Sequence, residues 1–416
     1  MSYGGNDIMN NSKKPSRSVL IGAAFLMATS AIGPGFLTQT SKFTATYGAS
    51  LIVVILMIIV MDMTAQMNIW TIIGVSGMRA QDVANRVLPG LGVFLAVLVA
   101  IGGLAFNVGN VGGVALGLNA MCGMNERLGA VIAGALGILI FSNKNAKTLM
   151  DKVTTVLATL ILISVAYVAV ISQPPLGEVA SGLTKFNEVP NMFTALTTIL
   201  GGSCGGYIAF SGAHRLLDAG ISGPENVKNI RTSVVQGCGT SGIVRILLFL
   251  AVLGTCTIGS QWNAANADAI INASNPASEA FRLSAGNLGY RLFGLCLFSA
   301  GISSVVGAAF TSVSFLKTLH PFIEQHESKF VVGFITFSTV MMVVVGGAAQ
   351  LLIIAGAVNG LILPVALGSM LLASRNKKIV GDYKHPTILL VMGIIVVFIS
   401  LISGIKALPT ILTLFG

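Results

Sequence analysis

Charged residues are scarce in this chain. Only 9% of its 416 residues are Asp, Glu, Lys or Arg, whereas a soluble domain carries about 25%. Hydrophobic residues make up 54%, and they form long continuous runs rather than the short alternating segments of a membrane barrel. The composition therefore excludes an ordinary water-soluble globular fold and predicts an all-α polytopic membrane protein.

Cysteine is also rare, and no CxxC spacing occurs. The five cysteines lie in or beside apolar runs, which favours packing over a disulfide framework or a metal cluster. The sequence contains no nucleotide-binding loop and no nucleophile–base or metal–water constellation, so we expect neither ATP-driven transport nor an enzyme. We predict no cofactor and no metal-ligating residues.

The few charges are distributed unevenly. Lys and Arg outnumber Asp and Glu by 24 to 14, which gives a net charge of +10. The basic residues lie mainly in segments between apolar runs, which is the positive-inside pattern of membrane proteins, so we expect no nucleic-acid partner. Residues 1–17 form a polar, basic tail that we expect to be cytoplasmic.

The apolar runs predict eleven membrane spans, each near the ~20 residues that cross a bilayer. With the N-terminus inside, seventeen Lys and Arg residues fall in inside segments and six in outside segments, while Arg245 lies within a span. The bias fixes this orientation, and eleven spans then place the C-terminus outside. Two outside loops, residues 173–191 and 259–283, are long. The predicted spans are residues 18–43, 49–74, 90–118, 128–142, 153–173, 192–218, 233–258, 286–314, 330–348, 350–373 and 385–405.

Two spans contain helix-breaking residues where a membrane helix should be continuous. The first is interrupted at Gly33-Pro34-Gly35-Phe36 and the sixth at residues 201–207. Lipid cannot satisfy the backbone groups that such breaks free, so they must be buried in protein or line a cavity. Paired breaks, one in each half of the chain, indicate the binding site of a transporter built from inverted repeats.

This pattern predicts a single transporter domain over residues 18–416. Residues 18–173 form the first five-helix repeat, residues 192–373 form the second, and residues 385–416 contain an extra eleventh helix. Repeats of this kind hold the solute near the midplane between their broken helices and work by alternating access.

Several stretches resemble the natural resistance-associated macrophage protein (NRAMP) family of metal transporters. Residues 26–36 lie where the family has its Asp-Pro-Gly-Asn motif, and residues 77–84 resemble its short loop after the second span. Residues 301–307 resemble the eighth span, which is rich in small residues, and Gln350 with residues 359–365 is similar to the tenth. The resemblance covers most of the chain. It implies secondary transport and the LeuT-type fold, a 5+5 inverted repeat in which helices 1 and 6 are broken.

The residues that hold the metal in this family are replaced. At the first break, Gly33 stands in place of the family's Asp and Phe36 in place of its Asn. At the second break, Gly205, Gly206 and Tyr207 stand in place of Met, Pro and His. Transition metals need nitrogen, oxygen or sulfur donors. The substitutions therefore argue against a typical transition-metal carrier.

The altered breaks favour a small organic acid. The first break exposes backbone N–H groups at the start of an outer half-helix, beginning near Leu37, where the helix dipole attracts an anion such as a carboxylate. The glycines of both breaks let a ligand approach the backbone, and two aromatic side chains supply walls. The predicted substrate-binding residues are Gly33, Pro34, Gly35, Phe36, Gly202, Gly205, Gly206 and Tyr207.

Two charged residues, Asp62 and Arg245, lie near the middle of spans. A charge at mid-membrane costs roughly 2.5–3.5 kcal/mol on insertion scales, so each should face protein or water. Asp62 is either the proton or sodium site that drives uptake or a structural anchor. Arg245 pairs with Asp62, neutralises an anionic solute or has a structural role. Further candidate pathway residues, which interhelical hydrogen bonding explains equally well, are Gln39, Asn107, Gln350 and Asn359.

We therefore predict a secondary active transporter in the cell membrane, driven by H⁺ or Na⁺, whose partners are a small-molecule substrate and the lipid bilayer. The sequence is compatible with a monomer but does not determine the oligomeric state. Bacterial NRAMP-like proteins without the metal motif occur beside 5-oxoproline-degrading enzymes, so the resemblance implies an amino acid or a 5-oxoproline-like acid. A divalent metal carrier for Mn, Fe or Mg is the alternative, because hydrated Mg²⁺ tolerates a site poor in ligands. A non-transporting membrane sensor is a third reading, which predicts binding without flux.

Overall fold

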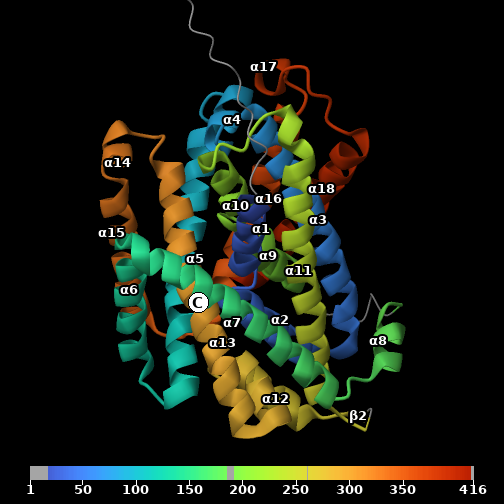
Figure 1. Cartoon of the computed structure of the whole chain (residues 1–416). Helices are drawn as coiled ribbons and strands as arrows, with labels where there is room; N and C mark the ends of the chain where they lie inside the picture. Colours follow the sequence, from blue (N-terminus) through green and yellow to red (C-terminus); the bar gives the residue numbers. More distant parts are fainter. Residues whose placement is uncertain (1–16, 185–191, 260, 414–416) are drawn as a thin grey trace, which may run out of the picture.

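A computed structural model of the chain describes residues 17–184, 192–259 and 261–413 (Figure 1). The predicted tail, residues 1–17, lies outside the described residues except for Arg17. The elements up to residue 184 are α1 (Arg17–Ala31), α2 (Pro34–Tyr47), η1 (Gly48–Leu51), α3 (Ile52–Ser76), α4 (Ala80–Val87), α5 (Leu91–Cys122), α6 (Glu126–Ser142), α7 (Lys144–Ile171) and α8 (Leu176–Gly182).

The second half of the chain repeats this helical pattern, with one short hairpin added. Its elements are α9 (Met192–Cys204), α10 (Ile208–Asp218), η3 (Pro224–Asn226), α11 (Val227–Thr255), β1 (Thr257–Ile258), β2 (Gln261–Trp262), α12 (Ala264–Asn272), α13 (Pro276–Leu316), α14 (Pro321–Gln325), α15 (Glu327–Val345), α16 (Ala348–Ala373), α17 (Lys377–Val380) and α18 (Thr387–Leu412).

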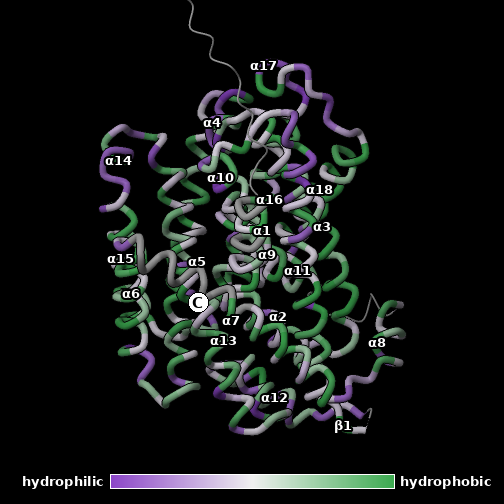
Figure 2. Tube along the Cα trace, viewed as in Figure 1, coloured by the Kyte–Doolittle hydropathy of each residue, from purple (hydrophilic) through white to green (hydrophobic). Residues whose placement is uncertain are grey.

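The helices have the length and composition of membrane spans. Among the described residues, eight helices are long and apolar enough to cross a bilayer, and a ninth candidate is the pair α7 and α8, which is bent by 102°. Each of the eleven predicted spans coincides with a helix or with two consecutive helices. Figure 2 shows a mostly hydrophobic middle and hydrophilic residues gathered towards the two ends. The chain is a multi-pass membrane protein.

The connecting elements sort to opposite ends of the molecule. In Figure 1, α4, α14 and α17 lie at one end, whereas α8, α12 and β2 lie at the other. The first group belongs to segments predicted to be inside, and the second to the two long loops predicted to be outside. The arrangement therefore agrees with the predicted alternation of the segments.

Helices that correspond in the two predicted repeats pack against each other. The most extensive helix–helix interface joins α5 to α13, the third spans of the two repeats. The second spans, α3 and α11, are in contact, and so are the fourth spans, α6 and α15. Two halves related by an axis in the membrane plane bring equivalent helices together in this way.

The first broken helix is interrupted earlier than the sequence predicts. Helix α2 begins at Pro34, so Ile32 and Gly33 separate it from α1. Proline suits the first helical position, because its fixed φ is already helical and its missing N–H needs no partner. The residue before a proline avoids the helical region, and Gly33 is extended, with φ −73° and ψ 177°. The predicted break at residues 33–36, with a helix starting near Leu37, was therefore wrong in its position.

The second break is shorter than predicted. Helix α9 continues through Gly201 and Gly202 to Cys204, which leaves residues 205–207 between the half-helices. A Cβ on Gly201 would lie 2.7 Å from Cα of Gly360 on α16, so this glycine permits close helix packing. The left-handed turn falls on Gly206, with φ +53°. The predicted break at residues 201–207 was therefore too long.

Two other boundaries differ from the prediction. The seventh span begins at Val227 rather than at residue 233. The predicted outside loop at residues 259–283 contains β2, α12 and the first turns of α13, and β2 pairs with β1 in an antiparallel hairpin. Helix α13 is kinked at Ala285 and Gly286. The region is rich in Asn and Ala, which indicated a loop in the sequence, but the side chains of Asn263 and Asn275 cap α12 and α13.

Candidate functional site

The two breaks lie against each other at the centre of the fold. Helix α1 contacts α10, and α2 contacts α9, so each half-helix runs beside a half-helix of the other repeat. The ends of four half-helices therefore converge. Helix starts carry free N–H groups and a partial positive charge, and helix ends carry free carbonyls and a partial negative charge.

At the first break, Gly35 and Phe36 occupy the first turn of α2. The N–H of Leu37 already bonds to the carbonyl of Gly33, at 3.2 Å. The N–H groups of Gly35 and Phe36 precede that bond, and helix geometry leaves them without an intrahelical acceptor. A Cβ on Gly35 would lie 2.9 Å from Cε1 of Phe106. The start of α2 is therefore an N–H-rich surface with an aromatic ring directly beside it.

At the second break, Tyr207 is the last residue before α10 and is 1% exposed. Its ring meets that of Phe106 edge-on, with the centroids 6.0 Å apart. The two rings connect the second break to α5 and form an apolar wall beside Gly35. Tyr207 was predicted as such a wall, whereas nothing in the sequence around Phe106 singles that residue out.

A buried guanidinium lies beside both breaks. Arg245, on α11, is 2% exposed, and its Cζ is 4.5 Å from the ring centroid of Phe36. Its Nη2 donates to Oγ of Ser203, in the last turn of α9. Its Nε and Nη1 have no hydrogen-bond partner among the described residues. The structure thus places Arg245, whose role the sequence left open, beside the predicted substrate residue Phe36.

Asp62, on α3, is the second buried charge of this region. It is 4% exposed, it interacts electrostatically with Arg245, and it lies beside Cys204. Its Oδ1 has no hydrogen-bond partner in the described part of the chain. An acid and a base, each with unsatisfied polar atoms, therefore share the space next to the second break. The sequence predicted both residues, and the structure brings them together.

Two amide side chains extend the site towards α16. Gln39 and Asn359 are fully buried. Nε2 of Gln39 donates to the carbonyl of Leu352 at 2.7 Å. A Cβ on Gly202 would overlap Oε1 of Gln39, and one on Gly206 would overlap Oδ1 of Asn359. The glycines of the second break therefore make room for these two amides.

The structure places two predicted pathway residues elsewhere. Asn107 is buried between helices, and its Nδ2 donates to Oγ of Ser338 on α15, at 3.1 Å. Gln350 is exposed in the first turn of α16. Asn107 thus connects two helices, and Gln350 does not join the group around the breaks.

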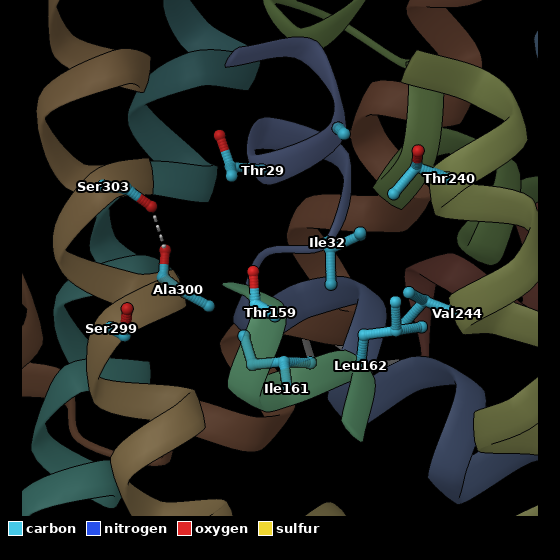
Figure 3. A pocket seen from close by; sticks show the side chains of 11 residues that line it. Thr29, Ile32, Thr159, Ile161, Leu162, Thr240, Val244, Ser299, Ala300 and Ser303 are labelled. Atoms are coloured by element: carbon cyan, nitrogen blue, oxygen red, sulfur yellow. Dashed lines mark hydrogen bonds between the residues drawn. The ribbon is translucent and has the colours of Figure 1, made fainter. Parts of the chain in front are cut away.

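A small cavity lies on the α1 side of the first break. It has a volume of about 110 Å³ and is bounded by α1, α7, α11 and α13. Figure 3 shows Ile32, Leu162 and Val244 among its side chains, together with hydroxyl groups such as those of Thr29 and Ser303. Among the described residues, its lining includes no charged side chain. The cavity offers an apolar space with a few hydroxyls directly before Gly33.

The site contains few groups that bind metals. Within the described residues, no three His, Cys, Asp or Glu side chains are grouped so that they could hold a metal ion. At the breaks, Gly33, Gly205 and Gly206 carry no side-chain donor, and Phe36 presents a ring. The donors that remain are the backbone, hydroxyl and amide oxygens, the Asp62 carboxylate and the Cys204 thiol. The positively charged Arg245 stands among them.

Comparison with known proteins gives one family. A family model described as natural resistance-associated macrophage protein-like matches residues 24–410. The chain is 49% identical to the uncharacterized membrane protein YcsG of Bacillus subtilis over 96% of both chains. It is 46% identical to an uncharacterized membrane protein of Haemophilus influenzae, over 93% of this chain and 95% of that one. Its identity to the divalent metal cation transporter MntH of Yersinia pestis is 23%, over 96% and 97% of the two chains.

Solved structures share the fold at low sequence identity. A mutant of the Eremococcus coleocola manganese transporter has a TM-score of 0.74 at 17% identity, and the match covers 97% of this chain and 89% of that one. MhsT in complex with L-phenylalanine has a TM-score of 0.67 at 14% identity, with 96% and 98% covered. The manganese transporter and MhsT thus have one architecture in common with this chain, which is the LeuT-type fold.

Proposed function

The chain belongs to the natural resistance-associated macrophage protein-like family of membrane transporters, and we propose that it carries a small organic solute bearing a carboxylate rather than a transition metal. The solute is an amino acid or a 5-oxoproline-like acid, bound between the two broken helices. Alternating access then moves it across the membrane. This proposal uses the family's architecture but gives the altered site a different cargo.

The position of Arg245 is the observation that carries the proposal. For a solute charge placed about 6 Å from the Arg245 guanidinium, at an effective dielectric constant of about 20, Coulomb's law gives an interaction of about 3 kcal/mol per unit charge. The guanidinium would therefore attract a carboxylate by about 3 kcal/mol and repel a divalent cation by about 6 kcal/mol. Buried charges need partners. Asp62 interacts electrostatically with Arg245, but two guanidinium nitrogens have no hydrogen-bond partner among the described residues. A bound carboxylate would supply those partners.

The breaks add donors for the same anion. The start of α2 offers backbone N–H groups at the positive end of a helix dipole, which is a favourable place for a carboxylate. Gly35 and Gly206 have no Cβ, and the space beside them is occupied by the ring of Phe106 and by Oδ1 of Asn359, so these two side chains stand closest to the main chain at the breaks. The aromatic wall of Phe106 and Tyr207 would contact the apolar part of the solute.

Asp62 is our candidate for coupling to an ion gradient. It is buried within a span, and a charge at that depth is costly unless it is neutralised. Protonation would remove the charge, and a sodium ion would compensate it. Because Asp62 interacts with Arg245, a solute that engages Arg245 would change the electrostatic environment of Asp62. We propose H⁺ or Na⁺ as the driving ion on this basis.

The charge bias supports the orientation that we propose for the protein in the cell membrane. The N-terminus would be cytoplasmic and the C-terminus outside, since most Lys and Arg residues lie in the segments at the inner end. We propose that one copy is sufficient for transport, because the site is built from helices of a single chain.

A divalent metal is the second candidate cargo. The observation that favours it is the similarity to proteins named as divalent metal cation and manganese transporters. A hydrated ion could be held by carbonyls, amides and water. This candidate requires the Arg245 charge to be offset, and Asp62 is the acidic residue placed to do so.

Binding and flux measurements on the purified protein separate these candidates. Amino acids, cyclic and linear carboxylates, Mn²⁺ and Mg²⁺ are first compared for their effect on the melting temperature, since a ligand of the native state raises it by mass action. Counterflow in proteoliposomes then distinguishes a carrier from a sensor that binds without flux. Imposed H⁺ and Na⁺ gradients, in the wild type and in Asp62→Asn, identify the coupling ion.

The organic-anion proposal predicts a shift with at least one carboxylate that is lost in Arg245→Gln. Loss of about 3 kcal/mol corresponds to roughly a 100-fold weaker affinity. The matched control is Arg231→Gln on the same helix, whose side chain donates to the Tyr383 hydroxyl at 2.7 Å and lies away from the breaks. A shift with metal ions alone would contradict the proposal.

A further inference from the structure

Two of the buried amides, Gln39 and Asn359, lie against the second break, and each has an oxygen without a hydrogen-bond donor among the described residues. Nε2 of Gln39 donates to the carbonyl of Leu352, and Nδ2 of Asn359 donates to the carbonyls of Gly102 and Ala355, at 2.9 and 2.8 Å. A carbonyl accepts hydrogen bonds but cannot donate them, so these contacts fix which end of each amide is the nitrogen.

The opposite ends of these amides are therefore acceptors. Oε1 of Gln39 and Oδ1 of Asn359 are buried and have no hydrogen-bond partner among the described residues. Buried acceptors in native proteins are nearly always satisfied, so such atoms indicate a place for a ligand or for bound water. An apolar ligand, or one with only acceptors, would leave both oxygens unsatisfied.

The two oxygens face the same broken helix. Oε1 of Gln39 lies against Gly202, before the second break, and Oδ1 of Asn359 lies against Gly206, within it. Ser203, which follows Gly202, receives the hydrogen bond from Arg245. The second break is thus flanked by two acceptors and one cation.

A ligand that is only an anion would leave these two acceptors without a hydrogen-bond donor. On the basis of the proposed function, we propose that the solute carries an N–H donor in addition to its carboxylate, and that Gln39 and Asn359 are the specificity residues that select it. Arg245 receives the carboxylate, and the two amide oxygens receive the N–H. The donor is the ammonium group of an amino acid or the amide N–H of a lactam acid, because either one forms an N–H···O bond.

Matched pairs of acids test the proposal directly. 5-Oxoproline is compared with 5-oxotetrahydrofuran-2-carboxylate, in which a ring oxygen replaces the amide N–H at the same net charge. Proline is compared with tetrahydrofuran-2-carboxylate, in which a ring oxygen replaces the ammonium N–H groups together with their positive charge. Dissociation constants are measured on the purified full-length protein. We expect the N–H member of at least one pair to bind roughly 10- to 100-fold more tightly, since an unsatisfied buried partner has a cost of that order. The pair that shows the preference identifies the donor as ammonium or amide.

Variants then assign the preference to residues. Gln39→Met and Asn359→Leu remove the two acceptors, and we expect each to bring the affinity ratio of the preferred pair towards one. A purely structural role would weaken both members equally and leave that ratio unchanged. Gln350→Met, at the exposed start of α16, is the control that should keep the wild-type ratio. If a variant fails to fold, the affinity ratio of the two acids in each pair, measured on the wild-type protein, still decides whether the site prefers a solute with an N–H donor.

The outcomes separate this inference from the proposed function. Equal binding of both members of each pair, with sensitivity to Arg245→Gln, overturns the N–H inference and leaves the carboxylate site standing. An N–H preference that persists in both Gln39→Met and Asn359→Leu overturns the assignment of these residues. Binding of metal ions with no binding of any acid refutes the proposed function itself.

Discussion

Gly206→Ala should destabilise the protein by roughly 2–4 kcal/mol, because two costs add at this position. Gly206 has a φ of +53°, and a left-handed conformation costs an L-residue roughly 1–2 kcal/mol. The new Cβ would also overlap Oδ1 of Asn359. If Asn359 moves away, it loses its bonds to the carbonyls of Gly102 and Ala355, at roughly 1 kcal/mol each.

Thermal unfolding in detergent measures this effect. An unfolding entropy of about 2.1 cal/mol/K per residue implies a change of roughly 1 °C per kcal/mol for a chain of this length, so we expect the melting temperature to fall by roughly 2–4 °C. The control is Gly368→Ala on α16, where an added Cβ meets no atom within 4 Å. Alanine favours a helix over glycine by up to ~1 kcal/mol, so the control should be unchanged or slightly more stable. Equal melting temperatures for Gly206→Ala and the wild type would refute the reasoning about this turn.

Two further predictions concern the inner end of the molecule. Burial, together with the nearby positive charges, lowers the pKa of His385 to about 4, and its Nε2 lies 2.8 Å from Oδ1 of Asn68. The pKa of histidine in the unfolded chain is about 6.5. The contribution of neutral His385 to stability is therefore complete above about pH 6.5 and is lost as the pH falls towards 4. Melting temperatures from pH 8 to pH 4 should show this loss in the wild type, and a curve for His385→Gln that is equally steep would contradict it. Arg79 donates to Asp218 at 2.5 Å, between the start of α4 and the end of α10. Because this ion pair is partly exposed, Asp218→Asn should cost no more than about 1 kcal/mol. A larger fall in the melting temperature would contradict this expectation, because the ion pair would then contribute more to stability than an exposed pair does.

Membrane spans could be predicted well from the sequence because their physical signal is local. Each of the eleven predicted segments coincides with helix, since a long apolar run in lipid has no alternative that satisfies its backbone. The existence of the two breaks was predicted for the same reason. Their limits were not, because the first depends on how Pro34 fits a helix start and the second on which glycines serve packing.

The glycines of the sixth span illustrate that difference. Gly201 and Gly206 are alike in the sequence, and both were assigned to the break. In the structure, Gly201 is helical and packs against Gly360, whereas Gly206 adopts the left-handed turn. Only the neighbouring helix α16 decides between the two roles, and it lies more than a hundred residues away along the chain.

Some chemical features of the site can be read from the sequence, and others only from the structure. The loss of metal donors at Gly33, Phe36 and Gly205 is visible in the sequence, because a side chain that is absent cannot coordinate. The sequence left open whether Arg245 pairs with Asp62, serves the solute or has a structural role. The structure places the Arg245 guanidinium over Phe36, which joins a residue of the seventh span to the first break.

The sequence alone determined the class of protein, its spans and the two interruptions, because hydrophobicity, helix breaking and charge bias act over short stretches of chain. The tertiary structure decided which polar groups meet at those interruptions. Arg245, Asp62, Gln39 and Asn359 come from four different helices, and no local pattern records that they converge. Each of these four side chains has a polar atom without a hydrogen-bond partner among the described residues, and this depends on how the helices pack rather than on any local stretch of sequence.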